Sequence, residues 1–245
     1  MNKNDELQIY GGSDFIVNDK IKIMQPTLRE IRDFGEQRYF SFVNSFTATP
    51  TDMKYQLSKM GLDWNTVSDY EFFLMMYKLF DQKSSALIFG DLDFTKFVTV
   101  TADNDEIVLY DSGSGIVIDR SIYEISTNYI RKVHNLSYHV ERAMNETTKN
   151  VLLEEAEENF NMSKDKEYKS NLLPLISTMT NMEGFKYNWS TVWDMKINAF
   201  MDSVQQLLHI KNVDLLLQSG YSGFGVDLKK ISNKQLDYFS RPSER

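Results

Sequence analysis

The chain contains no cysteine among its 245 residues. Without thiols it cannot form a disulfide framework, use a thiolate nucleophile, or hold zinc or an iron–sulfur cluster through sulfur ligands. This composition is unfavourable for a small secreted scaffold and fits a reducing compartment. We therefore expect the protein to lie in a cytoplasm.

Basic residues are also in short supply. Lys and Arg total 27 against 35 Asp and Glu, which gives a formal net charge of −8 and a pI near 5.0. A protein that binds nucleic acid through the phosphate backbone neutralises it with basic side chains. DNA and RNA are therefore not expected as partners.

Long apolar runs are equally rare. A membrane-spanning helix needs about 20 consecutive apolar residues, and every apolar stretch of the chain is interrupted well before that length. The polar residues 1–6 lack the apolar core of a signal peptide. We expect no membrane partner and no targeting segment.

Residues that carry catalytic chemistry are few. The only histidines are His134, His139 and His209, and the first two are five residues apart, whereas a helical zinc pair has a spacing of four with a glutamate between. No P-loop, dinucleotide-binding glycine pattern or Gly-x-Ser-x-Gly elbow occurs. We predict no enzymatic activity, no metal site and no cofactor. A triad assembled from distant residues leaves no such motif, so an unfamiliar enzyme stays an alternative.

The first third of the chain predicts a β-hairpin followed by helices. Extended runs bounded by turn residues predict strands, at residues 7–10, 15–17 and 21–23. Thr27 and Glu30 have the spacing of a capping box, which predicts a helix start. Gly35 interrupts the apolar repeat of that helix, so a bend or restart is expected there. Thr51 is a candidate cap for a further helix, and Ser68 with Glu71 forms a second capping-box pattern.

Between residues 86 and 119 the apolar pattern becomes that of short strands. Turns rich in Asp, Asn and Gly separate four runs, at residues 86–89, 94–101, 107–110 and 116–118. The segment therefore predicts a small antiparallel β-meander, which needs the helices as support on one face.

The second half of the chain is predicted to be helical. Asp119 caps a long helix whose apolar stripe reaches Val140, and the most polar stretch, residues 141–170, reads as an exposed helix or connector. Further helices are predicted from Asn171 and from Ser190, the latter with a break near residues 212–214. The predicted fold class is mainly α with a small antiparallel β-meander inserted (α+β), in three regions: residues 1–145, 146–170 and 171–245.

Aromatic residues are abundant, with 16 Phe, 13 Tyr and 3 Trp, alongside 12 Met. Large rings and methionine dominate both protein cores and protein–protein interfaces. A core position is the simpler interpretation for most of them, whereas a glycine-loosened loop such as 220–225 favours a surface. The candidate partner-binding residues are Trp193, Phe200, Tyr221, Phe224, Tyr238 and Phe239.

Long segments of the chain resemble a family of poorly characterised proteins encoded among the late structural genes of tailed phages of Gram-positive bacteria. The resemblance covers nearly the whole chain and is carried by the segments KIKIMQPTLREIRDFGEQRYFSFVNSFTATPTDMKYQLSKMGLDWNTVSDYEFFLMMY, LIFGDLDFTKF, DRSIYEISTNYIRKVH, FKYNWSTVWDMKINAFMDSVQQLLHIKN and SGYSGFGVDLKKISNKQLDYF. Residues 141–170 match least.

This resemblance implies a role in phage morphogenesis and gives no active-site residues. It points to a tail assembly chaperone in the host cytoplasm, which binds a tape-measure, tube or baseplate protein through apolar and aromatic surface. The alternatives are a virion component of the neck or baseplate, and a phage protein that engages a host protein or is sensed by a host defence protein. Self-association into a homo-oligomer stays open.

Overall fold

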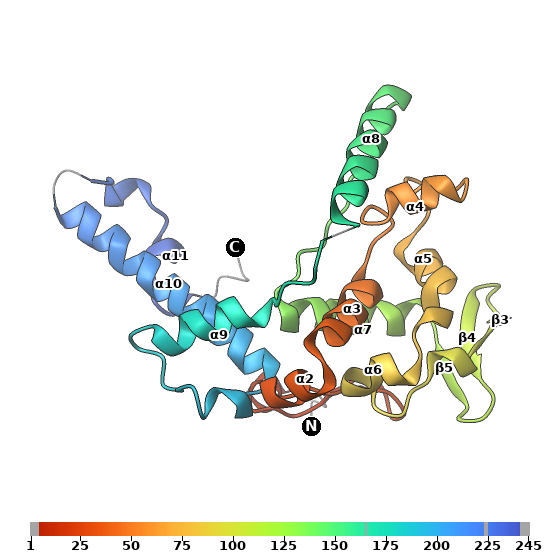
Figure 1. Ribbon diagram of the computed structural model, residues 1–245, viewed down its shortest axis with the longest axis horizontal. Helices are drawn as coiled ribbons and strands as arrows, with labels where there is room; N and C mark the ends of the chain where they lie inside the picture. The colour runs from red at the N-terminus through yellow and green to blue at the C-terminus, as the bar shows by residue number, and fades with distance from the viewer. Residues whose placement is uncertain (1–4, 165, 223–224, 241–245) are drawn as a thin grey trace.

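The computed structural model describes residues 5–164, 166–222 and 225–240, and it is mainly helical with two small antiparallel sheets (Figure 1). The α-helices are α1 (Glu6–Tyr10), α2 (Leu28–Phe34), α3 (Glu36–Thr47), α4 (Lys54–Lys59), α5 (Asp69–Met76), α6 (Gln82–Phe89), α7 (Arg120–His134), α8 (Glu146–Ser163), α9 (Leu172–Asn181), α10 (Ile197–Tyr221) and α11 (Asn233–Leu236). The strands are β1 (Phe15–Ile16), β2 (Lys22–Ile23), β3 (Val98–Thr101), β4 (Ile107–Asp111) and β5 (Ile116–Ile118). The predicted α+β fold class is confirmed. Across these described residues no helix combines the length and apolarity needed to cross a bilayer.

The N-terminal hairpin is present but shorter than predicted. β1 and β2 pair antiparallel, with Phe15 opposite Ile23. The prediction of a strand at residues 7–10 was wrong, because this segment belongs to α1. The Asp5 carboxylate accepts hydrogen bonds from the backbone N–H groups of Leu7 and Gln8 and so supplies the cap of that helix.

The helix starts read from capping boxes are confirmed. Thr27 and Glu30 exchange the two predicted hydrogen bonds at the start of α2, and Ser68 and Glu71 do so at the start of α5. Gly35 separates α2 from α3 with a φ of 102°, a left-handed value that glycine adopts most readily. Thr51 does not cap α4, because its hydroxyl oxygen accepts a hydrogen bond from the backbone N–H of Glu141 instead.

The meander has three strands in the order β3-β4-β5, all antiparallel. Residues 86–89, predicted as its first strand, form the end of α6. The Asp81 carboxylate accepts a hydrogen bond from the Ser84 N–H and caps that helix, and the chain leaves it at Gly90 with a φ of 62°. Residues 94–96 form the 3-10 helix η2 (Phe94–Lys96), so only the end of the second predicted run is a strand.

Helix α7 begins at the Asp119 cap as predicted but stops at His134, short of Val140. Asn135 follows it in the left-handed conformation, with a φ of 55°, and ends the helix. Helix α8 then projects from the body beside α4 (Figure 1), and none of its residues is buried. The polar segment is therefore an exposed helix, one of the two predicted alternatives.

The last long helix is continuous and starts later than predicted. Residues from Ser190 first form a turn and the 3-10 helix η3 (Val192–Asp194), and α10 begins at Ile197. The predicted break at residues 212–214 is wrong, because α10 runs without interruption through this stretch, where Val213 is fully buried. Beyond α10 lie the 3-10 helix η4 (Leu228–Lys230) and α11.

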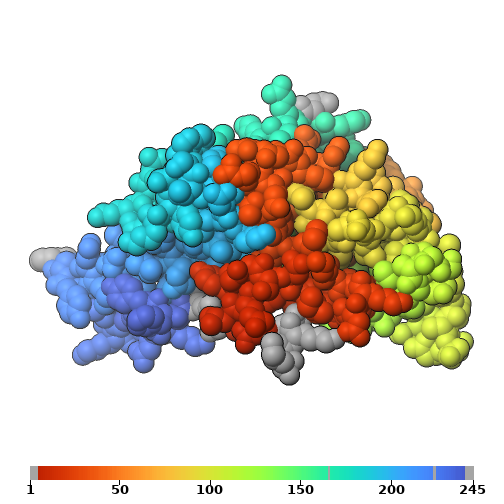
Figure 2. All heavy atoms as spheres, turned by 90° about the horizontal axis from the view of Figure 1, so that it is seen from below, coloured from red at the N-terminus to blue at the C-terminus, as the bar shows by residue number. Residues whose placement is uncertain are grey.

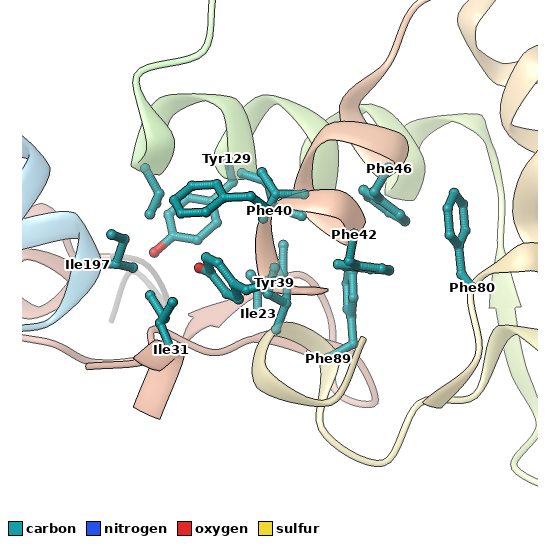
Figure 3. Close-up of a cluster of buried hydrophobic side chains, with 14 of the residues drawn as sticks. Ile23, Ile31, Tyr39, Phe40, Phe42, Phe46, Phe80, Phe89, Tyr129 and Ile197 are labelled. Atoms are coloured by element: carbon teal, nitrogen blue, oxygen red, sulfur yellow. The ribbon is translucent and has the colours of Figure 1, made fainter. Parts of the chain in front are cut away.

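One large core includes residues from both sides of the polar segment 146–170. Its centre is a set of rings on α3, α5, α6 and α7 that meet edge to face, stacked or tilted; α3 contributes Tyr39, Phe40, Phe42 and Phe46 (Figure 3). The C-terminal region adds Ile176, Ile197 and Phe200 to the same core.

A short backbone pairing joins residues 26–28, at the start of α2, to residues 195–197, at the start of α10. The Leu28 N–H donates to the Met195 carbonyl and the Ile197 N–H donates to the Pro26 carbonyl, both at 2.9 Å. The N-terminal segment consequently lies between the C-terminal helices and the sheet in the middle of one face (Figure 2).

Candidate functional site

The three histidines do not converge on a catalytic or metal site. His134 is buried, where its Nδ1 lies 2.7 Å from the Ile130 carbonyl and its Nε2 lies 2.7 Å from the Tyr39 hydroxyl. Burial lowers the pKa of His134 to about 4, so the ring is neutral near pH 7, with Nδ1 donating and Nε2 accepting. His139 is exposed and His209 is buried against the C-terminal tail. Within the part of the chain that the structure describes, no three His, Asp or Glu side chains are grouped to hold a metal ion.

A concave surface that carries two tryptophan rings lies between α2, α9 and the loop before η3. We call it the tryptophan groove; it has a volume of about 610 Å³, and the residues used to define it are Leu28, Arg32, Leu173, Ile176, Trp189 and Trp193. Leu28 and Ile176 are buried and form an apolar floor. Leu173 and Trp189 stand at the rim with 63% and 69% of their surface exposed.

The two tryptophans are held in place by local contacts. Trp189 and Trp193 meet edge to face with their ring centroids 5.5 Å apart, and the Arg32 guanidinium lies 5.1 Å from the Trp193 ring. The loop that carries Trp189 is fixed by the Asn188 side chain, whose Oδ1 accepts from the Ser190 N–H at 2.9 Å and from the Ser190 hydroxyl at 2.6 Å. The rings are therefore presented by an ordered turn.

The opposite wall of the groove is fixed by Glu36. Its Oε1 accepts hydrogen bonds from the backbone N–H groups of Asn171 and Leu172, at 2.7 and 2.8 Å, at the start of α9. A carboxylate at a helix N-terminus satisfies free donors and interacts favourably with the helix dipole. This contact sets the position of α9, and with it Leu173, across from the tryptophans.

The structure does not bring the six predicted partner-binding residues onto one surface. Trp193 is half-buried in the tryptophan groove. Phe200 is fully buried in the core, so its prediction as a surface residue was wrong; it lies on the inward face of α10. Phe224 lies outside the described residues.

The remaining three candidates lie at the C-terminal end. Tyr221 and Phe239 are highly exposed. The Tyr238 hydroxyl donates to the Asp214 carboxylate at 2.7 Å, which ties the tail to α10. Phe239 borders a separate hollow beside Leu7 and Tyr10.

Sequence reasoning missed Trp189 and Leu173. The prediction of a helix from Ser190 left Trp189 outside any regular element. The chain instead forms a turn and η3, and both tryptophans line the groove beside α9. The helix predicted from Asn171 does not by itself separate Leu173 from Leu172 and Ile176, which occupy the buried side of α9. The signal present in the sequence was the pair of tryptophans four residues apart.

Comparison with protein-family models, with curated proteins and with solved structures found no match for this chain.

Proposed function

We propose that this protein is a non-enzymatic phage assembly factor, a tail assembly chaperone of the host cytoplasm, that holds a phage structural protein in the tryptophan groove. The observation that carries the proposal is the pairing of exposed Trp189 and Leu173 over a buried apolar floor. Rings and aliphatic side chains that converge on a concave surface are the usual anchors of protein–protein contacts.

The geometry favours an apolar helical or extended segment of a partner chain as the occupant. An amphipathic helix that lies in a groove presents apolar residues three or four positions apart, and the groove offers an apolar floor between two fixed walls. The resemblance to late phage proteins supports a tape-measure, tube or baseplate protein as that partner.

Substituting Trp189 by alanine is expected to weaken partner capture by about 10- to 30-fold, as for a typical interface anchor. The measurement is affinity purification of the tagged full-length protein from infected cells, with quantification of the phage structural protein recovered. Because Trp189 is exposed, the free energy of unfolding should change by only about 0.5 kcal/mol. Leu173→Ala should weaken capture in the same direction.

The matched control is Leu215→Ala on α10, whose leucine is 65% exposed and lies away from the groove lining. It should leave capture unchanged. Equal recovery with the Trp189 and Leu215 variants would contradict the groove as the binding surface. Recovery of host proteins alone would instead favour a host-directed role.

Mass spectrometry of purified particles tests the chaperone role itself. A chaperone is expected in infected cells and missing from mature virions. Stoichiometric presence in the particle would make the protein a structural component of the neck or baseplate.

A further inference from the structure

Another hollow, of about 400 Å³, lies where residues 64–70, residues 120–131 of α7 and residues 138–142 meet. Three of its lining residues are arginines, Arg120, Arg131 and Arg142. We call it the arginine pocket. This gathering of positive charge stands out in a chain whose formal net charge is −8.

Arg131 is the most unusual of the three because it is only 7% exposed. Its Nη2 donates to the Thr47 carbonyl at 2.6 Å, and its guanidinium lies 4.8 Å from the Tyr138 ring. Its other N–H groups make no hydrogen bond, and no carboxylate lies within ion-pair distance, among the residues of the described ranges. Buried charges in proteins are nearly always paired, and an arginine cannot lose its proton.

The other two arginines are exposed and likewise lack an ion pair within the described ranges. Arg120 lies over the Tyr70 ring at 5.3 Å. By contrast, Arg29 and Arg32, elsewhere on the surface, are paired at 2.8 and 2.7 Å with Asp194 and Asp33. The pocket therefore gathers three guanidinium groups that form no ion pair with any described residue, although Asp69, Glu124 and Glu141 also line it.

A buried donor without a partner lies in the same lining. Trp64 is 3% exposed, and its indole Nε1 is buried and makes no hydrogen bond. An indole N–H can only donate, and an unpaired buried donor is costly. Trp64 packs against Leu57 and Phe72 in a small core cluster, and its Nε1 atom is out of reach of solvent, so an occupant of the pocket does not contact it.

Acidic residues in the lining reduce the positive charge without cancelling it. Glu141 forms an ion pair with Lys54 and is thereby occupied. Asp69 lies beside Tyr138; partial burial and that carboxylate raise the pKa of the Tyr138 phenol, which stays protonated. With Asp69 and Glu124 left against three guanidinium groups, the pocket has an excess of one positive charge.

We propose that the arginine pocket binds the carboxylate of an acidic side chain on the partner polypeptide. A guanidinium fork matches a carboxylate with two parallel hydrogen bonds, and one excess positive charge suits a singly charged group better than a doubly charged phosphate. The pocket walls also include apolar side chains, such as Val67 and Val140, that suit the methylene stem of a glutamate. This inference rests on the proposed function, because it supplies a charged contact to the same partner in addition to the apolar one.

Binding of a labelled peptide to the full-length protein tests this inference without any phage partner. The probes are a fluorescein-labelled Glu-Leu repeat decapeptide and its Gln-Leu counterpart, followed by fluorescence anisotropy. The glutamate peptide is expected to bind at least about tenfold more tightly, despite the net negative charge of the protein. Arg142→Gln and Arg131→Gln should each weaken it about tenfold or more, as for loss of a charged hydrogen bond.

The control is Arg29→Gln, which removes an exposed arginine that already has a carboxylate partner. It should leave peptide binding unchanged. Arg142 is exposed, so its variant stays informative if the Arg131 variant fails to fold. Arg131→Lys, which keeps the charge and loses the fork, should bind with intermediate affinity.

Competition identifies the source of the anion. Acetate and inorganic phosphate at equal concentration should displace the glutamate peptide poorly. The inference would be overturned if phosphate displaced the glutamate peptide at a concentration below that of the peptide. It would also be overturned if the two peptides bound with equal affinity, or if Arg142→Gln had no effect on binding. The two proposals can fail separately. The arginine variants can lose peptide binding while capture of the phage protein still depends on Trp189, or they can keep peptide binding while that dependence is absent.

Discussion

Substituting Phe46 by alanine is expected to lower the free energy of unfolding by about 3–5 kcal/mol, the range for a large buried ring. Phe46 is buried in the core, and Figure 3 shows it among the rings of Phe42, Phe80 and Phe89. Its partners are Phe42, Phe73, Phe80, Phe89, Phe94 and Tyr123, with centroids 5.1 to 6.1 Å away. Removing the ring leaves a cavity that this rigid set of neighbours cannot fill.

Urea unfolding followed by circular dichroism measures the effect as a lower midpoint with an unchanged slope. Phe239→Ala is the matched control, because that phenylalanine is 90% exposed at the C-terminal tail. It should change stability by about 0.5 kcal/mol or less. A Phe46 variant as stable as the Phe239 variant would show that the ring cluster is not the centre of the core.

Acidification from pH 7 to pH 5 is expected to cost about 2 kcal/mol of stability through His134 alone. In the folded protein burial lowers the pKa of this ring to about 4, against 6.5 for the ordinary group. As pH falls below 6.5, His134 becomes protonated in the unfolded chain but stays neutral in the folded protein. The stability contributed by the neutral ring is therefore present above pH 6.5 and is lost as pH falls towards 4.

The comparison is urea unfolding of the natural protein and of His134→Gln at pH 7 and pH 5. The variant should lose most of the difference between the two pH values, because glutamine does not titrate there. His139→Gln, at an exposed histidine, should behave like the natural protein. The carboxylates whose pKa values the fold lowers, such as Glu30 and Glu71, lose their contribution only below pH 4.5 and do not disturb this window.

Short sequence patterns correctly predicted the features that depend only on neighbouring residues. The capping boxes at Thr27 and Ser68 and the interruption at Gly35 depend on neighbouring residues, and all three occur as predicted. The errors arose where contacts with residues distant in the sequence determine the secondary structure. Residues 86–89 have the apolar character of a strand, yet α6 places Ile88 and Phe89 in the core, and no local pattern distinguishes those two outcomes for a short apolar run.

The candidate site was less predictable than the fold. Trp193 was singled out as a ring suited to an interface, and the structure places it in the groove. Phe200 has the same chemistry and lies in the core, because residue type alone does not say which face of α10 is covered. The arginine pocket left no motif at all, since it forms only where α7 and residues 138–142 meet the distant residues 64–70.

The backbone pairing of residues 26–28 with residues 195–197 dictates when this chain can finish folding on the ribosome. The Thr27 to Lys196 bridge cannot form before Lys196 has emerged, and at about 5–20 residues per second that stretch takes on the order of 10 to 30 s to translate. Throughout that interval the nascent rings of α3 lack Ile197 and Phe200 as cover. Translation arrested before this point would leave an incomplete, aggregation-prone product on the polysome.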